Sequence, residues 1–301
     1  MRISVLQQYP AKGYDFRWET PPLEELLKRQ KVAIDECFRM IDEAAMAGAD
    51  LAVTTETVNS CIALGDVRFH YPDVYEGMDG PTVKRFSEAA KSHGMHIVAG
   101  LLLTIEGKTY NCAVLFDSDG QIAGLHKKVH LPAGEELCVS AGDSFDVYET
   151  KLGRIGMLVC WDLQYPEAAR ELALGGADLI VCPTLGWEKT YGLARAYENS
   201  VTIAAAMANW GVEYGEFGDP ACIVNNMGRI IAEGPRTTEA VVTADVDIHK
   251  EPAPQYNSAL FYPSHSMRKT RFIQRRPDAY KLINQPIEKT PLYDRYFDKE
   301  G

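Results

Sequence analysis

Short apolar runs alternate along this chain with longer segments whose apolar residues recur at helical spacing. The first helical segment spans residues 23–48 and precedes the apolar run 49–55, and a second such pair follows at 82–93 and 96–102. This alternation is typical of an α/β fold. The sequence predicts further helices at 166–175 and 192–198, and further strands at 1–6, 110–116, 122–125, 155–159, 177–182, 201–206, 222–225, 229–232 and 240–246.

Two hairpins interrupt the alternation, with turns at residues 117–120 and 226–228. Helices must then cover one face of each sheet, while the other face packs on sheet or on more helix. We therefore expect a four-layer α-β-β-α sandwich. Residues 251–301 are rich in Pro, Tyr and Arg and have little periodicity. We expect one domain over residues 1–301, with 251–301 as an extended C-terminal arm that lies on its own body or on a partner subunit.

Charge and cysteine usage exclude several functions. The net charge is −11 and no basic run is longer than two residues, which argues against a nucleic-acid or anionic-membrane surface. No apolar stretch is as long as a signal-peptide core or a membrane span, so we expect a cytoplasmic protein. The seven cysteines form no Cys-x-x-Cys pair, so neither a zinc knuckle nor a disulfide framework is indicated.

Cys160 follows a strongly apolar run at residues 155–159. Such a run is typical of a buried central strand, and open α/β sheets place reacting groups at the carboxyl ends of their strands. Cys160 is therefore a candidate nucleophile. The alternative is a cysteine that only packs in the core, because free cysteine is among the most buried residue types.

Ionisable residues follow other predicted strands in the same way. Glu56 comes directly after the run 49–55, Lys128 lies just beyond the strand 122–125, and Glu135 and Glu136 come soon after. Taken singly, Glu56 could be an acidic residue at a helix N-terminus, and Lys128 could be solvated. Strands of one sheet bring their ends together, so the sequence indicates that these groups can meet.

These motifs resemble those of the nitrilase, or carbon-nitrogen hydrolase, superfamily. The resemblance rests on Glu56, on Lys-x-His-Leu-Pro at 128–132, and on Cys-Trp-Asp at 160–162 with Pro-Glu at 166–167. It extends through residues 142–143, 174–178, 194–199 and 226–229, nearly to Asp247. It implies that Cys160 is the nucleophile and Glu56 the acid–base group. Lys128 and the backbone N–H of Trp161 would stabilise the negative charge that develops on the substrate when the nucleophile attacks. A second glutamate, Glu135 or its neighbour Glu136, would orient the lysine, with Glu135 favoured.

The chemistry of the residues agrees with these implied roles. A free thiol has a pKa of about 8.5 and needs a base or a nearby cation to become a nucleophile at neutral pH. We expect hydrolysis of a primary amide or an N-carbamoyl compound through a thioester, with release of ammonia and without a cofactor or metal ion. True nitrilases usually have Cys-Trp-Glu, so Cys-Trp-Asp makes nitrile hydrolysis the lesser alternative. The alternative of another class is a non-catalytic binding or assembly member of the fold.

The substrate pocket is harder to predict. Trp187, Glu188, Tyr191 and Asn209 follow strands on the expected active face and are candidates to line it, although a loop tryptophan is as often a packing anchor. We expect His130 to make a structural hydrogen bond rather than to shuttle protons. The resemblance also implies a homodimer or a higher homo-oligomer.

Overall fold

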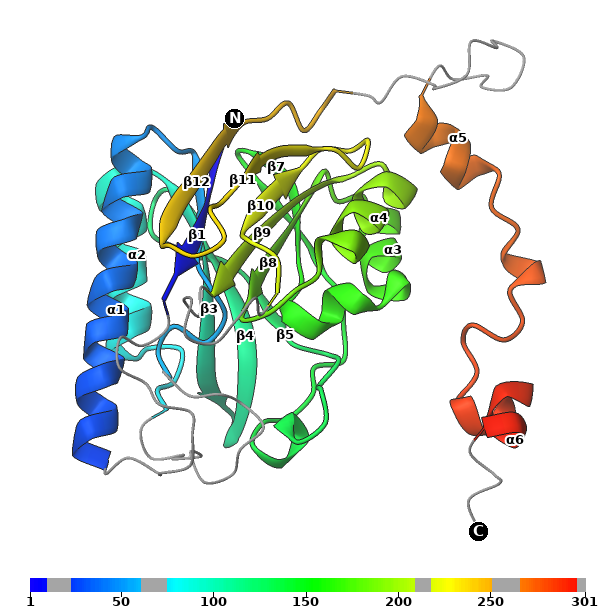
Figure 1. Cartoon of the computed structure of the whole chain (residues 1–301), viewed down its shortest axis with the longest axis horizontal. Helices are drawn as coiled ribbons and strands as arrows, with labels where there is room; N and C mark the ends of the chain where they lie inside the picture. Colours follow the sequence, from blue (N-terminus) through cyan, green and yellow to red (C-terminus); the bar gives the residue numbers. More distant parts are fainter. Residues whose placement is uncertain (10–22, 61–74, 209–217, 251–265, 297–301) are drawn as a thin grey trace. The chain divides into compact units, whose positions relative to one another are not determined.

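The computed structural model describes residues 1–9, 23–60, 75–208, 218–250 and 266–296. The chain divides into two compact units, Met1–Lys250 and Glu251–Gly301. Within the described residues, the first unit contains one sheet of twelve strands (Figure 1). The strands are β1 (Arg2–Gln8), β2 (Leu51–Val53), β3 (His96–Ile105), β4 (Lys108–Phe116), β5 (Ile122–Lys127), β6 (Val147–Thr150), β7 (Gly153–Met157), β8 (Leu179–Thr184), β9 (Thr202–Ala208), β10 (Cys222–Val224), β11 (Ile230–Glu233) and β12 (Ala240–Asp245).

The sheet runs in the order β5-β4-β3-β2-β1-β9-β8-β7-β6, with β12 paired to β1, β10 to β9 and β11 to β10. Strands β3, β2, β1, β9, β8 and β7 form the parallel part of this path. Strands β4, β5 and β6 pair with their neighbours in antiparallel fashion. The two edge strands approach each other where Tyr148 of β6 donates a hydrogen bond to the carbonyl of Leu125 in β5, at 2.5 Å. The sheet is therefore nearly closed and barrel-shaped.

Helices cover the outside of this sheet. Helices α1 (Leu23–Met46) and α2 (Pro81–His93) lie on one side, and α3 (Pro166–Leu174) and α4 (Lys189–Asn199) lie on the other (Figure 1). This confirms the predicted α-β-β-α arrangement. The sequence did not indicate that the two β layers are halves of one continuous sheet.

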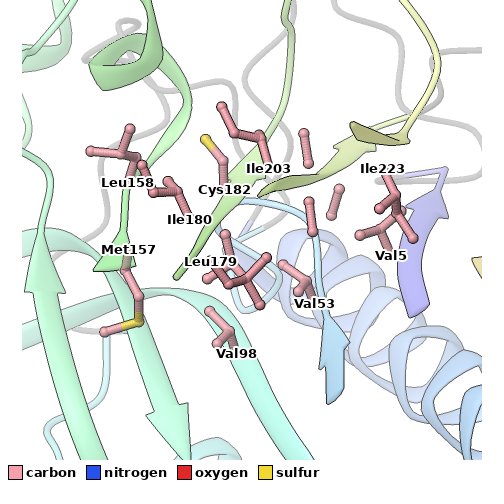
Figure 2. Close-up of a cluster of buried hydrophobic side chains, with 14 of the residues drawn as sticks. Val5, Val53, Val98, Met157, Leu158, Leu179, Ile180, Cys182, Ile203 and Ile223 are labelled. Carbon is pink, nitrogen blue, oxygen red and sulfur yellow. The ribbon is translucent and has the colours of Figure 1, made fainter. Parts of the chain in front are cut away.

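The main core lies between the two halves of the sheet. Figure 2 shows Val5, Val53 and Val98 from one half among the side chains of Met157, Leu179 and Ile203 from the other, all of them fully buried. These strands read as continuous apolar runs because the inner face packs on sheet and the outer face packs on helix. A second cluster lies under α1 and α2, where the rings of Phe38 and Phe86 are 4.6 Å apart.

The structure differs from the prediction at the neighbouring strands β6 and β7. Strand β6 was not predicted, because three of its four residues are only half-buried and the fourth is exposed, which leaves no apolar run. Strand β7 ends at Met157, two residues before the predicted end, because the chain leaves the sheet there and forms a 3₁₀ turn at Cys160–Gln164.

The second unit contains short helices. Helix α5 (Met267–Ile273) begins after Ser266, whose hydroxyl accepts a hydrogen bond from the backbone N–H of Lys269 at 3.2 Å. Helix α6 spans Pro291–Tyr296. Whether residues 251–301 act as an arm on a partner subunit stays a prediction. No helix in the parts of the chain that the structure describes is long and apolar enough to cross a membrane.

Candidate active site

The carboxyl ends of three parallel strands meet at one edge of the sheet. Glu56 follows β2, Cys160 follows β7, and Leu185 follows β8 directly. Because these strands run in the same direction, the segments that follow them leave the sheet on the same side. Strand order thus brings together residues that are up to 129 positions apart in the sequence, such as Glu56 and Leu185.

Lys128 and Glu135 reach this edge from the segment after β5. The backbone N–H of Lys128 donates to the carbonyl of Asn111 at 2.8 Å, and its carbonyl accepts from the N–H of Gly142 at 2.8 Å. Glu135 begins a 3₁₀ turn, Glu135–Leu137, and its side chain is 1% exposed. Glu136 is exposed. Of the two neighbouring glutamates, Glu135 is therefore the one whose side chain can contact Lys128.

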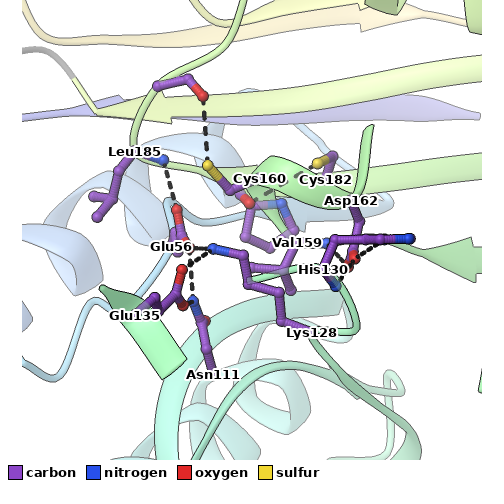
Figure 3. Close-up of polar contacts among 12 residues, drawn as sticks. Glu56, Asn111, Lys128, His130, Glu135, Val159, Cys160, Asp162, Cys182 and Leu185 are labelled. Atoms are coloured by element: carbon purple, nitrogen blue, oxygen red, sulfur yellow. Dashed lines mark hydrogen bonds and ion pairs between the residues drawn. The ribbon is translucent and has the colours of Figure 1, made fainter. Parts of the chain in front are cut away.

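The Lys128 ammonium lies between two carboxylates (Figure 3). Its Nζ atom is 2.9 Å from Oε1 of Glu56 and 2.7 Å from Oε2 of Glu135. All three side chains are at most 2% exposed. Three charged groups are this deeply buried only when they are paired, and such clusters are found mainly at functional sites.

Two neutral donors also contact Glu56. The side-chain amide of Asn111, in β4, donates to Oε1 of Glu56 at 2.6 Å and to Oε1 of Glu135 at 2.9 Å. The backbone N–H of Leu185 donates to Oε2 of Glu56 at 2.9 Å. The sequence motifs do not include Asn111. The available signal was a polar residue at the start of the apolar run Cys112–Phe116, because a buried polar side chain is more informative than a buried apolar one.

Cys160 occupies a strained position next to this cluster. Its φ angle is +45°, a region that non-glycine residues rarely adopt, and its Sγ donates to the carbonyl of Gly186 at 3.4 Å. Burial of the thiol, together with the charge of Glu56, raises the pKa of Cys160 to about 12, although Lys128 acts in the opposite direction. At neutral pH the resting thiol is thus protonated, and attack requires a base that removes its proton.

The protonation of Lys128 and Glu135 follows from their mutual contacts. Burial by itself lowers the pKa of Lys128, but Glu56, Cys160 and Glu135 together outweigh it, and the pKa of Lys128 is raised. The ammonium is therefore charged at neutral pH. Burial raises the pKa of Glu135, and the charge of Glu56 adds to this, while Lys128 and Asn111 oppose it.

A third buried carboxylate, that of Asp162, joins the segment around Lys128 to the turn that begins at Cys160. Asp162, which is fully buried, contacts Nε2 of His126 and Nδ1 of His130, both at 2.9 Å. It also accepts hydrogen bonds from the backbone N–H groups of Val129, His130 and Val159, at 2.8–3.2 Å. We call these five residues the Asp162 clamp. Burial opposes ionisation, but the histidine contacts outweigh it and lower the pKa of Asp162. The His130 ring makes this structural contact and stacks on Tyr165.

The structure separates the four candidates for the substrate pocket. Trp187 is 2% exposed, belongs to the main core, and donates from Nε1 to the carbonyls of Asp219 and Pro220, so its position suits a packing anchor. Glu188 is exposed at the start of α4. Tyr191 is half-buried and lies edge-on to Trp187. Asn209 lies outside the described residues.

Trp161 is the second residue of the 3₁₀ turn that begins at Cys160. The first N–H groups of a helical turn have no acceptor within that turn, so this position suits a backbone donor for developing negative charge. Among the residues that the structure describes, no group of three or more His, Cys, Asp or Glu side chains is arranged to hold a metal ion.

Comparison with known proteins bears on this site. Residues 23–251 match the family model described as carbon-nitrogen hydrolase. The chain is 30% identical over 235 residues to omega-amidase NIT2 of Xenopus tropicalis, covering 71% of this chain and 83% of that protein. It is 29% identical over 274 residues to N-carbamoylputrescine amidase of Solanum lycopersicum, covering 81% and 87%. A protein of Schizosaccharomyces pombe that is named a probable nitrilase is 30% identical over 218 residues, covering 69% and 76%.

Solved structures show the same fold. A carbon-nitrogen hydrolase from Helicobacter pylori G27 aligns with a TM-score of 0.71 at 21% identity, covering 95% of this chain and 98% of that one. A mutant of the amidase from Nesterenkonia sp. AN1 aligns with a TM-score of 0.70 at 21% identity, covering 93% and 95%. In that mutant the acetamide moiety of fluoroacetamide is attached covalently at the active-site cysteine.

Proposed function

Because this chain belongs to the carbon-nitrogen hydrolase family, we propose that it cleaves the C–N bond of a small primary amide or N-carbamoyl compound through a thioester on Cys160. One observation carries this proposal: the buried ammonium of Lys128 lies between Glu56 and Glu135 at the sheet edge where Cys160 leaves β7. A scaffold has no physical need for a thiol beside such a cluster.

The first half-reaction forms the thioester. Glu56 removes the proton from the Cys160 thiol as Sγ attacks the carbonyl carbon of the amide. Negative charge then develops on the carbonyl oxygen, and the ammonium of Lys128 and the N–H of Trp161 stabilise it. The C–N bond breaks as Glu56 returns the proton to the leaving nitrogen, which departs as ammonia.

The second half-reaction releases the acid. Glu56 is again an anion after ammonia has left, and it removes a proton from a water molecule that attacks the thioester carbonyl. The same two donors stabilise the second oxyanion. When the C–S bond breaks, the proton passes from Glu56 to Cys160, and the thiol is restored. Glu135 orients the lysine in both steps.

Two observations favour an amide over a nitrile. The nucleophile motif is Cys-Trp-Asp rather than Cys-Trp-Glu, and relatives at about 30% identity are named omega-amidase and N-carbamoylputrescine amidase. Because one relative is named a probable nitrilase, nitriles should also be tested as substrates. We also propose a cytoplasmic location, which is supported by the six free cysteines in the described part of the chain.

The test is ammonia release from a panel of primary amides, ω-amides, N-carbamoyl amines and nitriles. Cys160→Ala should abolish release from every active compound while the melting temperature changes little, because the substitution removes a single sulfur atom whose contact with the carbonyl of Gly186, at 3.4 Å, is weak. Cys222→Ala is the matched control, because Cys222 is also a free cysteine and lies within the main core. We expect that control to remain active.

Retained turnover in Cys160→Ala would remove the cysteine from the mechanism. Activity on nitriles with none on amides would shift the assignment to a nitrilase. A well-folded wild-type chain that releases no ammonia from any member of the panel would favour the non-catalytic binding or assembly protein instead.

A further inference from the structure

Asn111 is a fully buried amide that joins the two glutamates of the site. It lies near the start of β4, which is antiparallel to both of its neighbours, so its side chain reaches the edge where the parallel strands end. Each N–H of its amide group donates to a different carboxylate, Glu56 or Glu135 (Figure 3). Its orientation is fixed by this contact, because an amide oxygen in the same place would face two anions.

The contacts of the two glutamates show what Asn111 adds. The cluster has two carboxyl groups and only one ammonium, that of Lys128, so charge pairing alone leaves an excess of negative charge in a buried site. Hydrogen bonds to the charged form of a carboxyl favour ionisation. Oε2 of Glu135 accepts from Lys128, whereas Oε1 of Glu135 accepts from Asn111. Asn111 therefore supplies donors to the pair without adding a charge.

A purely structural role explains Asn111 poorly. Its Oδ1 atom is buried and has no hydrogen-bond partner among the described residues. Burying an amide oxygen in this way costs folding free energy, and an apolar side chain of similar size would avoid that cost. The benefit of an amide at this position lies in its contacts with the two glutamates.

We propose that Asn111 is a positioning residue for the hydrolase: it aims the Glu56 carboxylate and stabilises the anionic state of the glutamate pair, and so sets the pH above which the enzyme is active. The inference rests on the proposed function of the site. Because the two carboxyl groups interact, the relevant titration belongs to the pair rather than to either residue.

The first experiment is the pH profile of kcat/KM on the best primary amide from the panel. In Asn111→Leu the acidic limb of this profile should shift to higher pH by about one unit. The reason is that Glu56 and Glu135 lose the two hydrogen bonds that favour their charged form. Activity should fall by about tenfold on the acidic side of the limb and recover in part as the pH rises. Asn199→Leu is the matched control. Asn199 is also fully buried, its Oδ1 has no hydrogen-bond partner among the described residues, and its amide group donates to the carbonyl of Arg195 in α4, away from the glutamates.

A loss of activity that is equal at every pH, or an equal shift in Asn199→Leu, would overturn the proposal and leave Asn111 a structural residue. Asn111→Asp keeps the size of the side chain and serves if the leucine variant does not fold. It replaces the two donors by a third carboxyl group, so its acidic limb should also move up.

A second measurement does not depend on catalysis. Infrared difference spectra recorded over a pH series follow the protonation of the buried carboxyl groups, and in Asn111→Leu the midpoint of this protonation should lie about one pH unit above that of wild type. An unchanged midpoint contradicts the proposal. If wild type hydrolyses no member of the panel, the proposed function fails, while the infrared titration still decides whether Asn111 controls the protonation of the pair.

Discussion

The Cys160 thiol and the Lys128 ammonium are both held in their protonated states, and Glu56 contributes to both. Burial is the larger cause for the thiol, and the anionic Glu56 adds to it. For the lysine, burial acts in the other direction and is outweighed by Glu56 together with Cys160 and Glu135. At rest the site therefore has a neutral thiol beside the carboxyl group of Glu56. The proposed mechanism does not require a preformed thiolate, because in it Glu56 removes the proton when the substrate carbonyl is in place.

Glu56→Gln should change hydrolysis and alkylation in opposite directions. Loss of the base should lower kcat by about 100-fold or more. Loss of the negative charge lets Lys128 dominate the field at Cys160, so the pKa of the thiol should fall from about 12 and alkylation by iodoacetamide at pH 7 should become about tenfold faster. Intact-protein and peptide mass spectrometry measures the alkylation rate at Cys160.

Glu136→Gln is the control for that experiment, because Glu136 is an exposed glutamate next to Glu135. We expect it to match wild type in both assays. Slower alkylation in Glu56→Gln, or hydrolysis at the wild-type rate, would show that Glu56 does not control the thiol.

Single residues differ in how far the sequence predicts them. Glu56, Lys128 and Cys160 follow predicted strands, and the structure gathers them at one sheet edge, although their catalytic roles remain proposals. The choice between Glu135 and Glu136 depends on the 3₁₀ turn at Glu135–Leu137, which directs one side chain inward and leaves the other exposed. The contacts of Asn111 cannot be predicted from the sequence, because they join β4 to residues 55 and 24 positions away. No local pattern contains that information.

At the scale of elements, the Asp162 clamp links the segment after β5 to the turn after β7. Most of the strands and helices were predicted from their periodicity, but the end of β7 was misplaced by two residues. The reason is visible at Val159, whose N–H donates to the Asp162 carboxylate. The apolar run continues through Val159 while the hydrogen bonding changes, so hydropathy alone cannot locate the end of the strand.

Asp162→Asn should destabilise the fold by roughly 2–4 kcal/mol at pH 7, because a buried carboxylate with several donors is replaced by an amide that cannot accept from all of them. The pKa of Asp162 is lowered in the folded state, so its contribution is complete above the usual value of about 3.9 and is lost as the pH falls below it. The difference from wild type should therefore shrink in acid. Urea unfolding at several pH values measures it.

Asp119→Asn is the control for the clamp, because the Asp119 carboxylate forms an exposed ion pair with Lys151, and such pairs contribute little to stability. We expect little change in unfolding from that substitution. A loss of stability in Asp162→Asn that is the same at pH 7 and in acid would mean that the charge of Asp162 does not stabilise the fold.

At the scale of the whole molecule, the alternation of strands and helices in the sequence predicted the order of the layers. It did not predict that the sheet is nearly closed. The two halves are joined between β1 and β9 through only two residue pairs, at Gln7 and Gln8. A junction this short leaves no signal in the periodicity. It nevertheless fixes how the two sets of strand ends face each other, which decides whether Glu56 and Cys160 can share a site.

The two outer helical layers also differ in their surfaces. Helix α1 carries a row of exposed ion pairs, among them Lys28–Glu24, Lys31–Asp35 and Arg39–Glu43, which is typical of a solvated face. Helices α3 and α4 expose the apolar side chains of Leu174 and Tyr197. Helix α1 also exposes apolar side chains, Val32 and Met46 among them, but together with its row of ion pairs. Interface cores are depleted in charged residues and enriched in aromatic ones. We therefore propose that the homodimer implied by the family resemblance forms through α3 and α4 rather than through α1 and α2.

Leu174→Glu combined with Tyr197→Glu should convert this dimer to a monomer, because two carboxylates on each subunit would be buried without partners in the interface. Light scattering after gel filtration should give about twice the chain mass of 33.5 kDa for wild type, and the mass of one chain for the double variant. The control is Val32→Glu with Met46→Glu, which places the same charges at exposed apolar positions on α1 and should leave the dimer intact. A monomeric wild type, or dissociation by the α1 variant alone, would contradict the proposed interface.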